Sequence, residues 1–517
     1  MPKLTWWHGE RGPGRCRREV HTLYLEPVKG KVRLPMSFDH ATSSGVASSP
    51  PELNGVRPGE GALTVLAALE GAGFEAWIVG GWVRDALLGR PGHDIDICCS
   101  AGWEECESVL RSAGIGVVES GTRFGGITAI VDGERFEVTE YRLDGFYTDG
   151  RHPDHVEHAG SVEEDLARRD FTVNAMAWHP VRGLLDIYGG RDDLERRLIR
   201  AVGDPRRRFE EDALRMLRAV RFACRLGFTV EPGTAAALSE CAPLLSQVAQ
   251  QRIGDELDGI LVTGRGGEAM LRYPDTICAA VPELSAGRGF DQRSRYHIYD
   301  VYDHTGHVLD EAAKLSSQGG GAPGTVPSRT LMWAAFLHDI AKPDCFTLDE
   351  EGHGHFYGHP KLGAKMARGI MTRLARPSAL VRDSCLLIRY HDKPIQPERS
   401  DLLGVMRAFA KEGVDVPHLM DELFDIKRAD ALGKAPSCFD YIDEIEKMRG
   451  MVHGLLDSGD AYSLKTLDLS GGDLVRAGVE PGPRVGELLD RALSAHIAGE
   501  VQNERGALLA YLGLAES

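Results

Sequence analysis

Apolar and polar positions follow two different periodicities along the 517 residues. Up to about residue 194, short helical periods alternate with short β-type runs. The predicted helices cover residues 62–69, 82–88 and 103–112, and the predicted strands cover residues 76–79, 94–98, 116–119, 126–131 and 135–142. Beyond Leu194 the helical spacing is almost continuous. The pattern therefore predicts an α+β fold, in which a head with a small, mostly antiparallel sheet precedes an all-α body.

Changes in composition divide the chain further. Residues 1–58 mix Arg, Gly, Ser and Pro without periodicity, which is typical of a disordered extension. We expect the head over residues 59–195, a helical neck over 196–285, a further helical domain over 286–400 and a C-terminal helical tail over 401–517. A Gly- and Ser-rich stretch over residues 316–324 predicts a flexible loop inside the helical part.

Charge and cysteine content limit the classes of function. The formal net charge of −17 disfavours loose binding to nucleic acid, so an RNA partner would need a local basic face. The ten cysteines form no C-x-x-C pair, which is typical of reduced thiols in the cytoplasm. No apolar stretch approaches the roughly 20 residues that cross a bilayer, so we expect no membrane partner.

The strongest chemical signal is the sequence Asp94-Ile95-Asp96. On a strand, side chains alternate between the two faces, so both carboxylates would lie on one face while Ile95 points into the core. Two adjacent carboxylates repel each other unless a cation lies between them, and oxygen ligands suit Mg²⁺. Two such ions support phosphoryl transfer to a hydroxyl group. Glu137, in a later predicted strand, is a candidate third carboxylate; an ordinary exposed glutamate is the alternative.

A glycine turn precedes this pair. Gly80-Gly81 opens a predicted helix whose first turn contains Arg84 and Asp85. Glycines at a helix start let backbone N–H groups approach the phosphates of a nucleotide.

Together these residues resemble a known family. Gly80-Gly81-x-x-Arg84-Asp85-x-x-Leu88-Gly89 followed by Asp94-x-Asp96 is similar to the class II tRNA nucleotidyltransferases, which include CCA-adding enzymes, and to bacterial poly(A) polymerases. The resemblance implies a polymerase-β-like nucleotidyltransferase head that extends the 3′ end of tRNA with CTP and ATP and two Mg²⁺ ions, and no DNA partner.

Later motifs extend the resemblance. Arg168-Arg169-Asp170-Phe171-Thr172-x-Asn174 is similar to the family's second motif, which implies that Arg169, Asp170 and Asn174 surround the sugar and phosphates. Glu211-Asp212-x-x-Arg215-x-x-Arg218 is similar to the fourth motif, in which an Asp and an Arg read the incoming base. If this segment is helical, Asp212 and Arg215 share a face and match the edges of cytosine and adenine.

The same region contains arginines that could form the local basic face that an RNA partner needs. Arg215, Arg218, Arg221 and Arg225 fall within about a third of a helix circumference at ~100° per residue. The candidates for RNA binding are Arg206, Arg207, Arg208, Arg221 and Arg225.

The helical domain carries a second pattern, which resembles HD metal-dependent phosphohydrolases. An apolar helix ends in His338-Asp339, and further histidines precede and follow it. The resemblance implies a site for Mn²⁺ or Ni²⁺, with His304, His338, Asp339, His359 and His391 as candidate ligands. Polar packing between helices is the alternative.

Several functions share these motifs. A poly(A) polymerase, or an enzyme that adds only CC or only A, would retain nearly all of them, and the segment 144–162 is a candidate for the difference. A chain that is chiefly an HD phosphohydrolase with a degenerate RNA-binding head is a further alternative. A non-catalytic RNA-binding protein is disfavoured, because no interleaved aromatic and basic stretch is present. The sequence does not indicate the oligomeric state.

Overall fold

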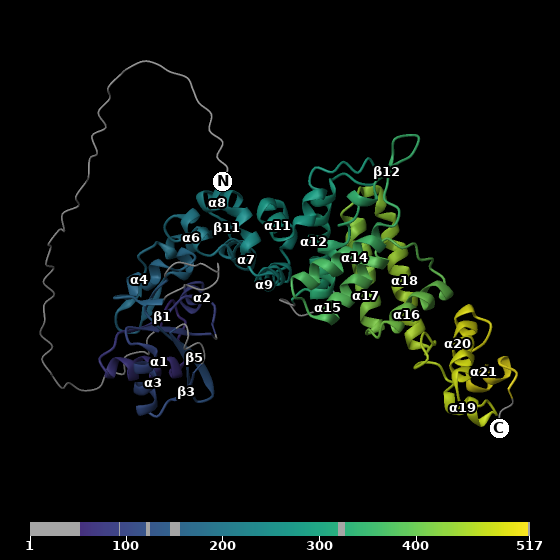
Figure 1. Cartoon of the computed structure of the whole chain (residues 1–517), viewed down its shortest axis with the longest axis horizontal. Helices are drawn as coiled ribbons and strands as arrows, with labels where there is room; N and C mark the ends of the chain where they lie inside the picture. Colours follow the sequence, from purple (N-terminus) through teal and green to yellow (C-terminus); the bar gives the residue numbers. More distant parts are fainter. Residues whose placement is uncertain (1–51, 93, 120–124, 145–155, 319–325, 515–517) are drawn as a thin grey trace, which may run out of the picture. The chain divides into compact units, whose positions relative to one another are not determined.

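The computed structural model describes residues 52–92, 94–119, 125–144, 156–318 and 326–514 (Figure 1). Most of the extension expected over residues 1–58, most of the segment 144–162 and most of the Gly-rich loop lie outside the described residues. Among the residues that are described, no helix combines the length and apolar character needed to cross a membrane.

The head is built on one mixed sheet. Its strands, from edge to edge, are β3 (Gly116–Val118), β4 (Gly126–Val131), β5 (Glu134–Glu140), β2 (Asp96–Cys99), β1 (Ala76–Val79), β8 (Ala177–His179) and β9 (Gly183–Leu185). Only β2 and β5 pair in parallel, and the other neighbours are antiparallel. The prediction of a small, mostly antiparallel sheet is therefore confirmed.

The two faces of this sheet have different cores. On β1, Ala76 and Ile78 join the main core, while Trp77 and Val79 join a smaller cluster with Cys98. Helices α1 (Glu60–Gly71) and α3 (Trp103–Ser112) pack on the first face, and α4 (Val162–Ala167) supplies the second cluster. This alternation follows from the two-residue period of a strand.

Short elements complete the head. They are α2 (Gly81–Leu87), β6 (Arg142–Asp144), β7 (Val156–His158), η2 (Thr172–Asn174), α5 (Gly190–Glu195) and β10 (Leu198–Ile199). Strand β10 pairs in parallel with β11 (Thr229–Val230) of the following region, so backbone hydrogen bonds join the head to the neck.

The rest of the chain is almost entirely helical, as the spacing predicts. The neck contains α6 (Pro205–Glu211), α7 (Arg215–Leu226), α8 (Pro232–Cys241), η3 (Ala242–Gln247), α9 (Gln250–Leu261), α10 (Gly266–Arg272), α11 (Pro274–Ala280) and η4 (Pro282–Gly287). The next region contains α12 (Val301–Gln318), α13 (Arg329–Leu337), η5 (Pro343–Cys345), β12 (Thr347–Leu348), β13 (Gly354–His355), α14 (His359–Arg373), α15 (Ser378–Tyr390), α16 (Arg399–Lys411), α17 (Val416–Leu432), η6 (Pro436–Cys438) and α18 (Asp440–Asp457).

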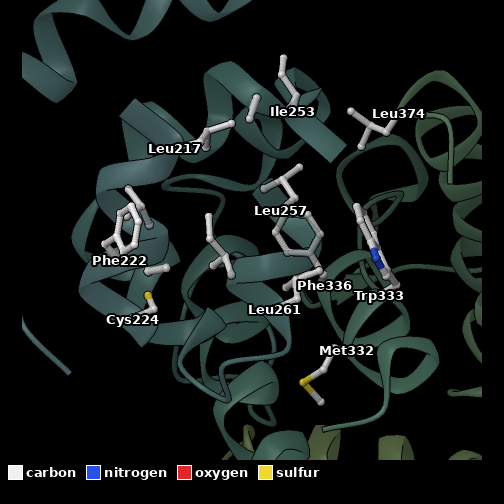
Figure 2. Close-up of a cluster of buried hydrophobic side chains, with 14 of the residues drawn as sticks. Leu217, Phe222, Cys224, Ile253, Leu257, Leu261, Met332, Trp333, Phe336 and Leu374 are labelled. Carbon is white, nitrogen blue, oxygen red and sulfur yellow. The ribbon is translucent and has the colours of Figure 1, made fainter. Parts of the chain in front are cut away.

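Neck and helical body share one apolar core. Figure 2 shows Leu217 of α7 and Leu257 of α9 in the same cluster as Trp333 and Phe336 of α13. Leu257 and Phe336 are both about 1% exposed. Helix α9 is therefore one element through which the neck meets the helical body, and α10, which packs against α12, is another.

The boundary expected at residue 400 is wrong. Helix α17 packs against α12 and α13, and Ile445 and Val452 of α18 belong to the same main core. A separate core begins only near Ala461 and contains α19 (Gly471–Arg476), α20 (Pro483–Ala498) and α21 (Arg505–Tyr511). Helical periodicity is identical on both sides of residue 400, so it could not locate this division.

Candidate functional site

Three carboxylates gather at the middle of the head sheet. Asp96 on β2 lies directly opposite Glu137 on the parallel strand β5, so both side chains leave the sheet on the same face. Asp94 precedes β2 and is exposed. Burial, followed by the charge of Glu137, raises the pKa of Asp96 from 3.8 to about 6, and Asp94 adds to the rise. The raised pKa reflects burial first and neighbouring negative charge second, and a divalent cation would relieve both effects.

Only one of the two aspartates lies on strand β2. The strand begins at Asp96 and not at Asp94, so the two-residue period does not place both aspartates on one strand face. Ile95 and Ile97 are nevertheless buried, as predicted. The partner that the sheet itself supplies to Asp96 is Glu137, because parallel pairing joins positions distant in sequence.

The glycine turn lies directly beside Asp96. Gly80 has a φ of +71°, and a Cβ atom there would lie 2.9 Å from Nη1 of Arg169 and 3.9 Å from Oδ2 of Asp96. A side chain at position 80 would therefore fill the space between a guanidinium and a carboxylate. Arg169 also donates a hydrogen bond to Asp165, at 3.1 Å. Gly80, Arg169 and Asp96 thus form one polar surface at the start of α2.

A chain of buried hydrogen bonds supports this surface. Arg84 contacts both carboxylate oxygens of Asp85 and donates to Oδ1 of Asn174 at 2.7 Å. Asn174 donates to Oδ1 of Asp170 at 3.1 Å, and Arg218 contacts Oδ2 of Asp170 at 2.7 Å. Burial raises the pKa of Asp170, but Arg218 and Asn174 outweigh it and hold the pKa below its ordinary value. Arg84, Asp85, Asn174 and Asp170 therefore form a scaffold that is satisfied before any ligand arrives.

The prediction that Asp212 and Arg215 lie on one helical face is wrong, because Asp212 is not in a helix. Helix α6 ends at Glu211 and α7 begins at Arg215, and Asp212 between them has extended backbone angles. Oδ1 of Asp212 accepts a hydrogen bond from the backbone N–H of Leu214, which explains the break, since Asp favours such local capping over a helix interior. Its Oδ2 pairs with Arg252 of α9 at 3.0 Å.

Arg215 is engaged elsewhere. Its guanidinium pairs with Glu211 at 2.9 Å and donates to the backbone carbonyls of Arg168 and Arg208. The residue is only 8% exposed. Sequence reasoning missed Arg252 as the partner of Asp212, because the two residues are 40 positions apart and belong to different elements.

Local acids neutralise much of the expected basic face. Arg206 pairs with Glu240, Arg207 and Arg208 pair with Glu211, and Arg221 pairs with Glu256 at 2.5 Å. Arg225 is exposed. Arg206 and Arg207 are also the best exposed of the paired arginines, so these three retain the best access to a phosphate.

A second polar centre lies inside the helical body. The ligand atoms of His304, His338, Asp339 and Asp430 lie within 4.8 Å of one another, and so do those of Asp339, His359 and His391. All six residues are buried. The structure therefore brings together all five ligand candidates named from the sequence and adds Asp430.

Asp339 is the shared member. Its Oδ2 lies 3.4 Å from Nε2 of His304 and 3.1 Å from Nε2 of His338. Its Oδ1 lies 3.4 Å from Nε2 of His359 and 3.5 Å from Nε2 of His391. Two ligands of one tetrahedral ion are separated by about 3.3 Å when each bond is about 2.05 Å. These spacings fit cations held between the imidazoles and the carboxylate.

The tautomers of the four histidines agree with this interpretation. Each Nδ1 faces a backbone carbonyl, which can only accept, so each Nδ1 carries the proton. The carbonyls belong to Gly433, Ala335, Phe356 and Ile388, at 3.1, 2.9, 2.8 and 2.7 Å from His304, His338, His359 and His391 respectively. Every Nε2 is left with its lone pair toward the shared aspartate, as in second-shell control of metal ligands.

Asp430 could have been found in the sequence. Leu423, Lys427 and Asp430 follow one another at helical spacing on the buried face of α17. The last two therefore place charges at core positions. Lys434 contacts Oδ2 of Asp430 at 2.6 Å, and Lys342 contacts Oδ2 of Asp339 at 2.7 Å. Burial raises the pKa of Asp430, but the charge of Lys434 outweighs it and holds the pKa well below its usual range. Both aspartates therefore remain charged.

A cleft of about 750 Å³ opens onto this centre. Asp339, His359 and His391 contribute to its lining, together with Lys342 and Lys393. A cleft with cationic side chains around a candidate metal site suits an anionic substrate such as a phosphate ester.

Comparison with known families divides the chain in the same way. The model described as poly A polymerase head domain matches residues 76–200, and probable RNA and SrmB-binding site of polymerase A matches 227–276. The HD domain model matches residues 301–434, and putative tRNA nucleotidyltransferase domain 2 matches 456–512. The HD match therefore includes Asp430.

Individual relatives agree over nearly the whole chain. A CCA-adding enzyme from Limosilactobacillus fermentum is 31% identical over 469 residues, which covers 90% of this chain and 98% of that protein. One from Leuconostoc mesenteroides is 30% identical and covers 86% of this chain and 93% of that protein. The crystal structure of the Bacillus stearothermophilus CCA-adding enzyme in complex with CTP is 25% identical, with a TM-score of 0.62, and covers 88% and 96% of the two chains.

Removing the partner of Asp170 should cost stability in a pH-dependent way. Because the pKa of folded Asp170 is depressed, its pairing stabilises the protein above about pH 4 and is lost as the pH falls through the folded value. We expect Arg218→Ala to lower the free energy of unfolding by about 2 kcal/mol at pH 7, a figure reduced for the partial exposure of Arg218, and by less at pH 4. Urea unfolding at both pH values measures this. The double variant Arg218→Ala/Asp170→Asn should recover part of the loss, and an equal loss at both pH values would contradict the assignment.

Proposed function

Because this chain belongs to the family of CCA-adding enzymes, we propose that it builds or repairs the 3′-terminal CCA of tRNA with CTP and ATP. The observation that carries the proposal is the grouping of Asp96, Glu137, Arg169 and Gly80 on one surface of the head sheet. The relatives with solved structures include complexes with CTP and with ATP. A cytoplasmic location is part of the proposal, and the cysteines that the structure describes are all free thiols.

The proposed reaction is nucleotidyl transfer. The 3′-oxygen of the tRNA attacks the α-phosphorus of the nucleotide, its proton leaves, and the bond to pyrophosphate breaks. Asp94, Asp96 and Glu137 would hold two Mg²⁺ ions, which activate such a hydroxyl and stabilise the leaving group when bound. Gly80 leaves room for phosphate oxygens beside Arg169, whose guanidinium neutralises their charge.

The buried scaffold would orient the nucleotide. Asp170, Asn174 and Arg84 are already hydrogen-bonded to one another, so the backbone around them is fixed before binding. This preorganisation reduces the entropy lost when a triphosphate is positioned for attack.

Asp212 is the proposed reader of the base. Its carboxylate accepts from Arg252 and from a backbone N–H, and its lone pairs can also accept from the amino group of cytosine or adenine. Uracil and guanine present a carbonyl there instead, which leaves the carboxylate facing another acceptor. Arg215, whose guanidinium carries five N–H donors, would add donors to the base beside Asp212.

Products on defined tRNAs test the proposed activity against its alternatives. With CTP and ATP, tRNAs that lack CCA, CA or A should each be extended to a complete CCA end, and extension should then stop. A poly(A) polymerase would continue to add AMP, and a CC-adding or A-adding enzyme would complete only one of these substrates. Denaturing gels of end-labelled tRNA resolve the three outcomes.

Removal of one metal ligand tests the acidic group. Asp96→Ala should lower CMP and AMP incorporation by at least about 1,000-fold, because transition-state charge is no longer stabilised, while circular dichroism and the unfolding midpoint stay close to those of the parent protein. Glu134→Ala, at an exposed position on β5, is the matched control and should retain activity. Substantial incorporation by Asp96→Ala would refute the two-metal assignment.

Asp212→Ala should relax the choice of base. Loss of the carboxylate removes the penalty on UTP and GTP, so the ratio of kcat/KM for CTP to that for UTP should fall by about 10-fold or more. Incorporation with each nucleotide alone measures this ratio. If CTP and ATP remain preferred to the same degree, Asp212 is not the reader.

The helical body supports a second candidate function. The convergence of four Nε2 atoms on Asp339 favours a metal-dependent phosphohydrolase, in which water adds to phosphorus and an ester bond breaks. Mn²⁺ and Ni²⁺ suit these imidazole and carboxylate donors. The intact acidic group and buried scaffold of the head argue against a degenerate head that serves only this hydrolase.

Metal addition tests the hydrolase. The full-length protein with Ni²⁺ or Mn²⁺ should hydrolyse bis(p-nitrophenyl) phosphate or p-nitrophenyl phosphate, and His391→Gln should lower that rate by about 10-fold or more without loss of tRNA extension. The exposed His418→Gln is the control. Equal hydrolysis by His391→Gln and the parent would show that the centre is not responsible.

A further inference from the structure

A second group of metal-binding side chains lies outside the buried centre. One ligand atom from each of Asp349, Glu351 and His353 lies within 4.8 Å of the others. His355 is a neighbour of this group of three, because its Nε2 lies 3.0 Å from Oδ2 of Asp349. All four residues come from the β12–β13 hairpin and its turn, and none is a ligand of the buried centre.

The aspartate orients this group. Oδ1 of Asp349 accepts the backbone N–H groups of Glu351 and His353, so Oδ2 is left toward the histidines. Nδ1 of His353 lies 3.4 Å from Oδ2 of Asp349 and 3.6 Å from Oε2 of Glu351. Two imidazoles with two carboxylates form a mixed donor set that borderline transition metals prefer, unlike a purely acidic surface cluster.

The hairpin that carries the group is anchored at its base. The rings of Phe346 and Phe356 pack together at 5.6 Å, and each also packs against Phe290. The backbone N–H of Gly354 donates to the carbonyl of Arg293 at 2.9 Å. The ligands therefore leave a backbone that is already fixed, which lowers the cost of ordering them around an ion.

The group lies at the outer part of the cleft above the buried centre. Its four residues line the same cleft as Asp339 and His391. The side chain of His353 is 58% exposed, whereas that of Asp339 is 1% exposed. A cation entering the cleft from solvent meets the hairpin before it reaches Asp339.

We propose that Asp349, Glu351, His353 and His355 form a separate, solvent-facing transition-metal site on the hairpin. Its ligands are exposed and few, so it binds Ni²⁺ or Zn²⁺ more weakly than the buried centre and exchanges the ion readily with solvent. An ion held there joins residues of the hairpin turn at the mouth of the cleft.

Titration with the metal alone tests this site. Calorimetry of the full-length, metal-stripped protein with Ni²⁺ should show one binding event that is absent from both Asp349→Asn and His353→Gln. Glu350→Gln removes a neighbouring exposed carboxylate outside the group and should retain all binding events. Unchanged stoichiometry in Asp349→Asn and His353→Gln would overturn the proposal.

Hydrogen exchange localises the effect. Ni²⁺ should slow amide exchange over residues 347–355 in the parent protein and in Glu350→Gln, but not in Asp349→Asn. Exchange that slows equally in all three proteins would assign the effect to the buried centre and refute the hairpin site.

A different observation concerns α9, whose two faces serve different partners. At ~100° per residue, Arg252 and Glu256 lie within about 40° of each other, and Gln251, Gly254, Asp255 and Asp258 cluster on the far side. The first face contacts residues that the proposed function assigns to the nucleotide. Arg252 holds Asp212 at 3.0 Å, and Glu256 holds Arg221, while Arg218 lies 4.0 Å from Glu256.

The opposite face is fixed to the HD domain. Asp258 accepts from Nε1 of the buried Trp333 at 2.5 Å and from the guanidinium groups of Arg329 and Arg376. Arg376 also donates to Asp255 and to the backbone carbonyl of Gln251. The buried Trp333 and Arg376 thus converge on one carboxylate of α9.

The backbones are close as well. A Cβ atom on Gly254 would lie 2.5 Å from the carbonyl oxygen of Leu374, so α9 and the end of α14 are in direct contact. Figure 2 shows Leu257 of α9 beside Trp333 and Leu374 in the shared core. Because α9 is a continuous helix of 12 residues, a shift at its HD-facing side also moves Arg252.

We infer that the HD domain sets the position of Asp212 through Asp258 and α9, which makes Asp258 a positioning residue for nucleotide choice; this rests on the proposed reading role of Asp212. Loss of the contact lets α9 and Arg252 shift, and discrimination between CTP and UTP weakens without loss of the acidic group.

Selectivity separates this role from a merely structural one. Asp258→Asn should lower the ratio of kcat/KM for CTP to that for UTP by about 5-fold or more, and Asp258→Glu should restore part of it. Gln251→Ala, which removes an exposed side chain of the same helix and leaves its backbone carbonyl in place, is the control. A fall in kcat for all nucleotides with an unchanged ratio would overturn the inference. If Asp212→Ala also leaves the ratio unchanged, the proposed reading role fails as well, so the two failures are distinguishable.

Discussion

The ion pair between the buried Asp170 and the partly exposed Arg218 is the interaction on which the head and neck depend. Charge cannot be buried without a partner, and the two residues are 48 positions apart in the sequence. The pair therefore holds α7 against the head, on the same side as the hydrogen-bonded Asn174 and Arg84. Glu256 of α9 then faces Arg218 and Arg221 together. The Asp170–Arg218 pair thus connects the surface around Gly80 to helix α9, whose Arg252 contacts Asp212.

The carboxylate group of the head and the histidine centre of the helical body differ in how their negative charge is neutralised. In the head, carboxylates crowd one another, and the pKa of Asp96 rises to about 6. In the helical body, Lys342 contacts Asp339 and Lys434 contacts Asp430, and the two lysines favour the charged form of these buried carboxylates. The first arrangement leaves the neutralisation of negative charge to a ligand, whereas the second is largely neutralised by the protein itself.

Salt bridges determine which arginines of this acidic chain stay available to bind tRNA phosphates. Glu211, Glu240 and Glu256 neutralise most of the arginines around α6 and α7. Exposed cations such as Arg225 remain, so attraction to phosphate is local and does not depend on the overall charge of −17. Such short-range contacts favour a defined RNA end over non-specific binding along a nucleic acid.

The sequence by itself determined the α+β head, the mostly antiparallel sheet, the helical body and the family, because periodicity and motif spacing are local properties of the chain. It also named five of the six residues of the buried histidine centre. Only the tertiary structure placed Glu137 opposite Asp96, paired Asp212 with Arg252 and added Asp430. It also ended α6 before Asp212 and extended the HD domain beyond residue 400. These features depend on which distant charges meet and which helices share a core, and neither follows from the spacing of residues within one segment.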